Sequence, residues 1–184
     1  MYQVNKTALD GCLRLEPNIF RDHRGTSIKT FHIEDFRDYG INNNFVEDLI
    51  VVSNKNVLRG LHFQNPPFAQ AKLVYCVKGS ILDVVLDIRR DSPTYGNYEM
   101  FNIDASNFSI LYIKEGFAHG YLALEVDTVV MYKMSSVYNK KLEGGIRWNS
   151  IDIPWGISKP IISERDESFV AFNDFRSNFN YVDI

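Results

Sequence analysis

The chain has 184 residues, of which 45% are hydrophobic and 14% aromatic, so it can bury a substantial core, and its length favours one domain over residues 1–184. Its 20 basic and 23 acidic residues are well mixed and give a formal net charge of -3, which leaves no broad positive face for nucleic acid. The sequence has no apolar run of membrane-spanning length, no signal-peptide pattern and no C-x-x-C pair of cysteines. We therefore expect a cytoplasmic protein that binds neither membrane nor nucleic acid.

The N-terminal part predicts short strands and one helix. Loose alternation of polar and apolar residues over 1–20 favours an edge or pairing strand. Turn-forming residues at 21–25 predict an exposed turn, and the apolar-containing run 26–31 predicts a further strand. Helical spacing over 33–39, with Gly40 at its end, predicts a short helix.

From residue 45 onward, short runs rich in Val, Ile, Leu, Tyr and Phe alternate with turns, which is typical of an antiparallel barrel or sandwich. Alternation over 73–77 and 82–88 around a turn at 78–80 predicts a hairpin with one buried and one solvated face. Further strands are predicted at 99–103, 109–113, 121–124 and 128–134, and one or two helical turns at 163–175.

One stretch combines charge, a titratable group and a glycine in an apolar, strand-like setting. Arg59, Gly60 and His62 lie within four residues, and Lys72 follows shortly after. Cationic groups are costly to bury without an anionic partner, so this stretch predicts a site for an anionic small molecule. Strict alternation would place Arg59 and His62 on opposite faces, so we expect a break such as a bulge at Gly60 if both line one pocket.

Other candidates also have ordinary structural interpretations. His119 lies in an apolar run, Gly-Phe-Ala-His-Gly-Tyr, where a histidine is most often a hydrogen-bonded core residue. Tyr132, on a predicted strand, fits a half-buried aromatic, and Asp166 fits a capping box with Ser163 as the N-cap. Gln64 stands where a zinc or iron site in a small barrel would need its second histidine, so we expect no metal.

Several motifs occur together, in one order, over nearly the whole chain. They are Leu58-Arg59-Gly60-Leu61-His62-Phe63-Gln64, Ala71-Lys72-Leu73-Val74, Asp87-Ile88-Arg89, Glu115-Gly116-Phe117-Ala118-His119-Gly120-Tyr121, Tyr132-Lys133 and Ser163-Glu164-Arg165-Asp166. With these motifs the chain closely resembles the dTDP-4-dehydrorhamnose 3,5-epimerase family of nucleotide-sugar epimerases. The resemblance implies an all-β, cupin-type jelly roll with short peripheral helices, a homodimer with exchanged N-terminal strands, and catalysis without metal or other cofactor.

The same resemblance implies roles for individual residues. His62 would be the general base, Asp166 the carboxylate that orients it, and Tyr132 the general acid. Lys72 and Arg59 would lie near the C4 oxygen and the phosphates of a nucleotide-diphosphate sugar. A 4-keto group acidifies the hydrogens on both neighbouring carbons, so a base and a fixed positive charge at the enolate oxygen suit its epimerisation. Further substrate-pocket positions would be Arg24, His119, Tyr138 and Glu143.

Two stretches depart from the family pattern. Lys29 stands where the family has a glutamate, and residues 45–51 place Glu47, Leu49 and Ile50 where the family has glutamine, asparagine and histidine. Those positions serve nucleoside and sugar recognition in the family. The departures predict an altered ligand. They leave open which nucleotide it carries (dTDP, CDP or GDP), which sugar it is, and whether C3, C5 or both carbons are inverted.

The favoured function is epimerisation at C3 and/or C5 of a nucleotide-activated 4-keto sugar through an enolate, for deoxysugar and surface-polysaccharide biosynthesis. A 3,4-ketoisomerase on the same fold is one alternative, since it also passes through an enediolate but moves the carbonyl. A non-catalytic cupin that binds sugar nucleotides is another, and it would exchange no hydrogen with solvent.

Overall fold

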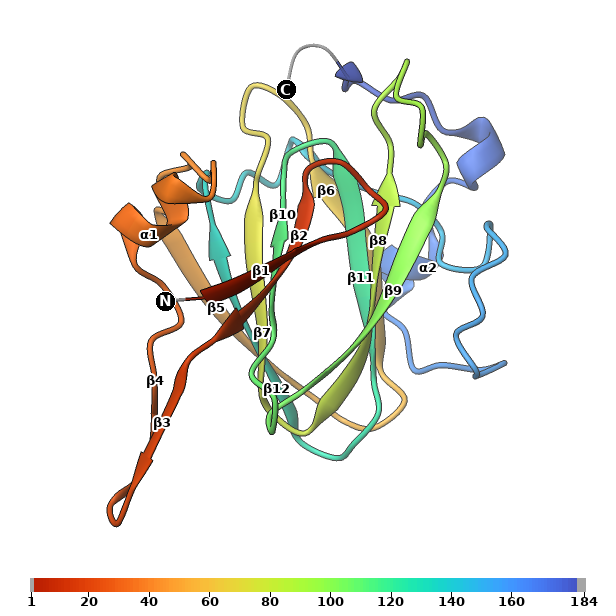
Figure 1. Cartoon of the computed structure of the whole chain (residues 1–184). Coiled ribbons are helices and arrows are strands. Elements are labelled where there is room, and N and C mark those ends of the chain that lie inside the picture. The colour runs from red at the N-terminus through yellow and green to blue at the C-terminus, as the bar shows by residue number, and fades with distance from the viewer. Residues whose placement is uncertain (1, 182–184) are drawn as a thin grey trace.

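Two antiparallel sheets face each other in the computed structural model, which describes residues 2–181 (Figure 1). One sheet has the order β1-β2-β10-β7-β12-β5, the other β13-β6-β11-β8-β9, and β3 and β4 form a separate hairpin. This is a jelly-roll arrangement with short peripheral helices. The strands are β1 (Tyr2–Lys6), β2 (Cys12–Pro17), β3 (Ile19–Asp22), β4 (Gly25–Ile28), β5 (Glu47–Ser53), β6 (Leu58–Gln64), β7 (Lys72–Lys78), β8 (Ser80–Asp87), β9 (Tyr98–Asp104), β10 (Ile110–Ile113), β11 (Phe117–Ala123), β12 (Thr128–Met134) and β13 (Glu143–Gly145), and the helices are α1 (Ile33–Asp38), α2 (Glu164–Glu167) and the 3-10 helix η1 (Phe172–Asp174).

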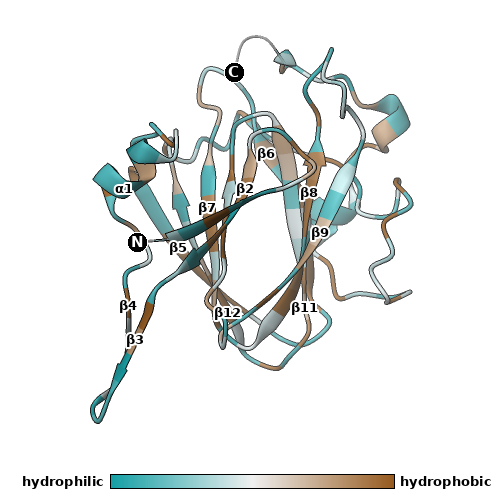
Figure 2. Ribbon diagram, viewed as in Figure 1, coloured by the Kyte–Doolittle hydropathy of each residue, from teal (hydrophilic) through white to brown (hydrophobic). Residues whose placement is uncertain are grey.

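The apolar side chains form three layers rather than one core. The central layer lies between the sheets and includes Val74, Val85 and Val130. A second layer joins the outer face of the five-stranded sheet to the C-terminal segment, and a third joins the outer face of the six-stranded sheet to α1 and the N-terminal strands. Figure 2 shows the resulting hydrophobic strand interiors and the hydrophilic tip of the β3–β4 hairpin. Central strands are therefore buried on both faces.

This double burial explains why the predicted hairpin at 73–88 is wrong. Strands β7 and β8 do form, but they belong to different sheets, so residues 78–80 carry the chain from one sheet to the other. The alternation predicted a solvated face, yet Leu73 and Val74 are both fully buried, as are Asp83 and Val84. A strand covered on both sides has no wet face whose pattern could identify its partner.

Predictions for the N-terminal part are largely confirmed. Of the stretch predicted over 1–20, the described residues 2–20 contain paired strands, with β1 at the edge of its sheet, and the turn at 21–25 joins β3 to β4. Helix α1 begins after His32, whose ring accepts a hydrogen bond from the Asp35 amide. Within residues 2–181, no helix is long and apolar enough to cross a membrane.

The predicted break in β6 is confirmed. His62 pairs with His119 and Arg59 pairs with Tyr121, so three residue steps on β6 oppose two on β11. Gly60, with φ of +133°, lies at this bulge, where an added Cβ would come within 2.6 Å of the Gly120 Cα. The extra residue turns Arg59 and His62 toward the same pocket.

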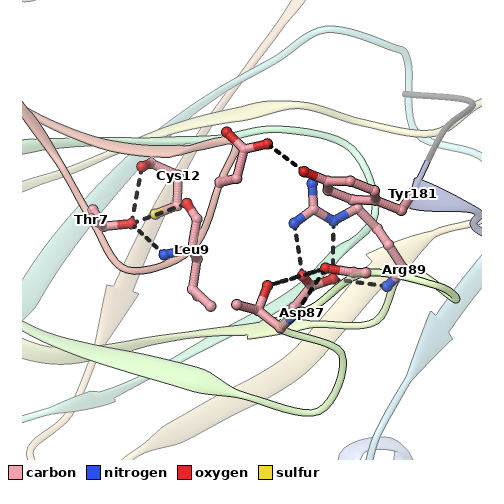
Figure 3. Close-up of polar contacts among 9 residues, drawn as sticks. Thr7, Leu9, Cys12, Asp87, Arg89 and Tyr181 are labelled. Atoms are coloured by element: carbon pink, nitrogen blue, oxygen red, sulfur yellow. Dashed lines mark hydrogen bonds and ion pairs between the residues drawn. The ribbon is translucent and has the colours of Figure 1, made fainter.

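A buried arginine fastens the C-terminal segment to the barrel (Figure 3). Arg89 is 2% exposed, and its guanidinium donates two hydrogen bonds to Asp87, of 2.9 and 2.7 Å. The guanidinium lies 4.2 Å from the ring centroid of Phe117 and 5.0 Å from that of Tyr181. The Tyr181 hydroxyl donates to Asp10 at 3.0 Å, so a carboxylate, two aromatic rings and the N-terminal loop meet around one cation.

We expect Gly60→Ala to destabilise the fold by more than ~3 kcal/mol, because the methyl group adds a backbone clash to a φ that L-residues rarely adopt. Gly25 is a matched control, since its φ is +126° but nothing lies within 4 Å of an added Cβ. Gly25→Ala should cost only about 1 kcal/mol of backbone strain. Urea unfolding of the three proteins measures both effects, and equal losses in the two variants would show that the close approach to Gly120 is unimportant.

Candidate active site

A pocket of about 390 Å³ opens between the two sheets and brings most of the predicted site residues together. This volume lies within the range of small-molecule sites. Strands β6 and β11 of one sheet supply Arg59, His62 and His119, and strands β7 and β12 of the other supply Lys72 and Tyr132. Tyr138, Glu143 and Glu47 also line it.

His62 is held by the carboxylate of Asp166. Its Nε2 lies 2.9 Å from Asp166 Oδ1, and the Asp166 Oδ2 accepts a hydrogen bond of 3.1 Å from the Gly60 amide. Ser163 caps α2 by accepting a hydrogen bond from the Asp166 backbone amide, as the capping box predicts. The side chain of Asp166, by contrast, points away from the cap and toward His62. Asp166 therefore joins the helix cap through its backbone amide and the His62–Asp166 dyad through its carboxylate.

The electrostatics of the dyad favour a neutral imidazole beside an ionised carboxylate. Burial opposes ionisation of Asp166, but hydrogen bonds from His62, Gly60 and Arg165 outweigh it and hold its pKa below the usual range. Burial also lowers the pKa of His62, although Asp166 acts in the opposite direction. An ionised carboxylate only accepts hydrogen bonds, so the shorter contact of Nε2, to Asp166, favours the tautomer with the proton on Nε2 and the basic lone pair on Nδ1.

Tyr132 and Lys72 come from the sheet that faces His62. Burial raises the pKa of Tyr132 well above its ordinary value, so its hydroxyl stays protonated. Burial lowers the pKa of Lys72 to about 8, which leaves the ammonium mostly charged at neutral pH. Its only hydrogen bond within residues 2–181 is a long one of 3.5 Å to the His62 carbonyl oxygen. A base, a phenolic donor and a cation thus surround one space from two sides.

Arg59 supplies a second cation without a carboxylate partner. Its Nε donates to Ser53 Oγ at 3.0 Å, and that hydroxyl lies 2.9 Å from the Tyr121 hydroxyl. Among the ion pairs of the described residues, none involves Arg59 or Lys72. Glu47 and Glu143 also line the pocket, but neither forms an ion pair with these two cations, so both cations are available to an anionic group of a ligand.

His119 takes part in a second, more deeply buried histidine–carboxylate pair. Its Nε2 lies 2.7 Å from Asp83 Oδ2, and both side chains are at most 3% exposed. The His119 ring packs edge-on against Tyr132 at a centroid distance of 5.9 Å. His119 is therefore both a satisfied core histidine, as its apolar flanks predict, and a wall of the pocket.

Hydrogen bonds of Tyr138 to two glutamates hold the mouth of the pocket. The Tyr138 hydroxyl donates to Glu143 at 3.0 Å, and the Tyr138 amide donates to Glu47 at 2.8 Å. Gln64, the residue in place of a metal-binding histidine, accepts from the Asn139 amide and donates to the Val137 carbonyl. It therefore anchors the loop that carries Tyr138.

Arg24 and Lys29 are predicted site residues that the structure does not bring to this pocket. Arg24 lies in the turn of the β3–β4 hairpin, which extends away from the body of the barrel (Figure 1). Its side chain is 79% exposed and pairs with Asp22 at 2.6 Å. Lys29 follows directly after β4.

Two polar residues of the site have no prediction from the sequence. Arg165 donates to Asp166 at 3.0 Å and to Glu143 at 2.7 Å, and its Nη2 lies 3.2 Å from His62 Nε2. Asp83 is fully buried in β8, where alternation had suggested a solvated position. The sequence feature that could have revealed Asp83 is a carboxylate among apolar strand residues. For Arg165 the only such feature is its position next to Asp166.

No group of three or more histidine, cysteine, aspartate or glutamate residues within 2–181 is arranged to hold a metal ion. The expected absence of a metal or other cofactor stays a prediction.

Known proteins share both the sequence and the fold. The family model for dTDP-4-dehydrorhamnose 3,5-epimerase matches residues 6–174. The dTDP-4-dehydrorhamnose 3,5-epimerase of Shigella flexneri is 41% identical over 93% of this chain and 96% of its own. The chain is also similar to a Legionella pneumophila dTDP-6-deoxy-D-glucose-3,5-epimerase solved with dTDP-4-keto-L-rhamnose, with 30% identity, a TM-score of 0.91 and coverage of 96% and 95%.

A 3'-monoepimerase from Streptomyces bikiniensis, solved with dTDP-quinovose, is similar as well, with 33% identity, a TM-score of 0.83 and coverage of 90% of this chain and 85% of that one. The matches extend over nearly the full length of the chain, and the predicted cupin-type jelly roll is confirmed. The chain belongs to the dTDP-4-dehydrorhamnose 3,5-epimerase family of isomerases.

Proposed function

We propose that this protein epimerises a dTDP-linked 4-keto-6-deoxy sugar at the ring carbons next to the carbonyl. The observation that carries the proposal is the His62–Asp166 pair, which faces Tyr132 across the pocket with Lys72 beside them. Relatives over nearly the whole chain carry this activity in their names. Lys72 and Arg59, two pocket cations without an ion-pair partner, suit a ligand with a diphosphate and a developing enolate oxygen.

In this mechanism His62 removes the proton through Nδ1. The lowered pKa of His62 keeps the imidazole neutral and ready to accept a proton near pH 7. Asp166 then stabilises the imidazolium through the hydrogen bond at Nε2, while Lys72 meets the negative charge that develops on the C4 oxygen. The electron pair of the broken C–H bond becomes the enolate.

Tyr132 returns a proton to the opposite face of the ring. It lies on β12 of the sheet opposite the one that carries His62, so donor and base approach the sugar from two sides. Inversion of a carbon needs this placement, because removal and return from one side would restore the original configuration. Arg59, whose planar fork suits bidentate contacts, is positioned to bind a phosphate.

A second copy of the chain completes the site in our proposal. The β3–β4 hairpin carries Arg24 outward, and Phe20 on it is 58% exposed. An apolar ring and a cation on a protruding hairpin suit insertion into another protomer. Arg24 would then lie at the partner's pocket, which fits the homodimer with exchanged N-terminal strands implied by the resemblance.

Both cysteines are free and buried, which fits a reducing compartment such as the cytoplasm.

The central experiment follows hydrogen exchange in deuterated water with dTDP-, CDP- and GDP-linked 4-keto-6-deoxyglucose. We expect deuterium at C3, C5 or both, fastest with the dTDP sugar, and a product whose carbonyl stays at C4. His62→Asn should lower exchange by roughly 10²-fold to 10⁴-fold, the usual contribution of a general base. His32→Asn is the matched control, because His32 caps α1 and asparagine also caps helices well.

A carbonyl shifted to C3 would identify a ketoisomerase, and tight binding without exchange would identify a non-catalytic cupin. Faster exchange with a CDP or GDP sugar would contradict the choice of dTDP.

The pH dependence of kcat/KM should be bell-shaped. Activity needs neutral His62, so it falls as pH drops through a pKa that burial places below the usual 6.5. It also needs charged Lys72, so it falls as pH rises through about 8. Lys72→Arg should remove the alkaline fall, since a guanidinium stays protonated there. An alkaline fall near pH 8 that persists in this variant would rule out Lys72 as its source.

Mixing two inactive variants tests the exchanged hairpin. Arg24→Ala and His62→Asn protomers are each expected to have low activity as homodimers. In a mixed dimer with exchanged hairpins, one pocket receives an intact His62 from one chain and an intact Arg24 from the other. Activity should therefore recover on co-refolding, toward one working site per mixed dimer. If each hairpin serves its own pocket, every site keeps one defect and no recovery occurs.

A further inference from the structure

Arg165 contacts both members of the His62–Asp166 pair. Its Nε donates to Asp166 Oδ1 at 3.0 Å, and the same oxygen lies 2.9 Å from His62 Nε2. Its Nη2 lies 3.2 Å from His62 Nε2 itself. The guanidinium therefore shares one carboxylate oxygen with the imidazole and places a positive charge beside Nε2.

The guanidinium is held in this position although the Arg165 side chain is 51% exposed. Its Nη1 donates to Glu143 at 2.7 Å, so a carboxylate on β13 fixes the outer edge of the fork. Its centre lies 6.0 Å from the ring centroid of Phe169, and that ring also packs edge-on against His62 at a centroid distance of 5.7 Å. A long side chain at the surface is thus tied to a defined place beside the base.

A guanidinium in this place opposes a positive charge on His62. Arginine has only N–H donors, so Nη2 can donate to Nε2 only while that nitrogen has no proton, whereas a charged imidazole has a proton on both nitrogens. A charged imidazole would therefore face a like charge 3.2 Å away, with no hydrogen bond between the two groups. Asp166 has the opposite effect, because its carboxylate stabilises the charged imidazole. Two adjacent residues of α2 act on one base in opposite directions.

Other groups also act on this imidazole. Burial is the largest cause that lowers the pKa of His62, Asp166 raises it, and the charges of Lys72 and Arg165 lower it further. Arg165 contacts Nε2, so it acts on the base from the nitrogen that does not take up the proton of the substrate. Asp166 contacts His62 from α2, and the charged and titratable side chains that line the pocket with it are Glu47, Arg59, Lys72, His119, Tyr132, Tyr138, Glu143 and Arg165.

We infer that Arg165 is a positioning residue that keeps His62 uncharged in the free enzyme, by sharing the Asp166 carboxylate with it and by placing a guanidinium beside Nε2. The inference rests on the proposed epimerase function, in which His62 must be neutral before it removes a proton. An ionised aspartate beside a histidine favours the charged form, which has no lone pair for the substrate. Arg165 offsets this effect before the reaction, while the Asp166 carboxylate stays in place for the imidazolium that forms later.

A pH titration of His62 in the free enzyme tests the inference without any substrate. Selective 15N labelling makes the ring nitrogens of the four histidines visible by NMR, and His62→Asn identifies the His62 signals by their loss. In Arg165→Gln, His62 should become protonated at a higher pH than in the wild type, because the positive charge beside Nε2 is gone.

The acid limb of kcat/KM should move in the same direction in Arg165→Gln, since it reports the ionisation of the base in the free enzyme. More of the enzyme is then protonated at a given acidic pH. On that limb, kcat/KM of the variant should therefore fall severalfold relative to its own value at the optimum, compared with the wild type.

Two further variants separate charge from structure. Arg165→Lys keeps a positive charge and should return both titrations toward those of the wild type. Arg176→Gln is the matched control, because Arg176 is exposed, donates to the backbone carbonyls of Asn173 and Phe175, and does not line the pocket. It removes the same charge from the chain and should leave the titration of His62 unchanged.

Protonation of His62 at a lower pH in Arg165→Gln would overturn the inference. That result would show that Arg165 only holds Asp166 in place, because a displaced carboxylate no longer favours the charged imidazole. An unchanged titration, or an equal shift in Arg176→Gln, would overturn the inference as well. Failure of the proposed function has a separate signature, which is the absence of hydrogen exchange with every 4-keto sugar at all pH values, whatever the titration of His62 shows.

Discussion

The close approach of β6 and β11 at Gly60 and Gly120 is the constraint on which the pocket depends. It permits the extra residue that turns Arg59 and His62 to the same side. The same backbone segment presents the Gly60 amide to Asp166, which in turn holds His62. A cation, a base and the partner of that base are therefore fixed by one irregularity in one strand. Regular pairing at this place would separate all three.

Features set by neighbours in the sequence could be predicted from it. The helix at 33–39, the turn at 21–25 and the Ser163 cap depend on a few adjacent residues and are found in the structure. Sheet membership could not be predicted in this way. Leu73 and Val74 are equally buried because each face of β7 is covered by a different layer, and such a strand has no alternation that reveals its partner.

The site shows the same division between local and distant causes. His62, Lys72 and Arg59 were predicted from their density of charge in an apolar run, and the pocket contains all three. The local pattern around Asp166 predicted a helix cap, and only the fold brings its carboxylate to a histidine more than 100 residues earlier. Arg165 was missed because nothing near it in the sequence indicates Glu143, the carboxylate that it joins to Asp166.

Strand β5 has a special position in this arrangement. It is one of the two edge strands of its sheet, and within residues 2–181 it pairs with β12 alone. Leu49 is 47% exposed although it lines the pocket. Substitutions there disturb few packed neighbours, unlike changes in β7 or β11, which are covered on both sides. The fold therefore separates a half of the pocket built on central strands, which carries His62, Lys72 and Tyr132, from a half on β5 where substitutions cost little packing. New substrate preferences can evolve at the rim without putting the stability of the barrel at risk.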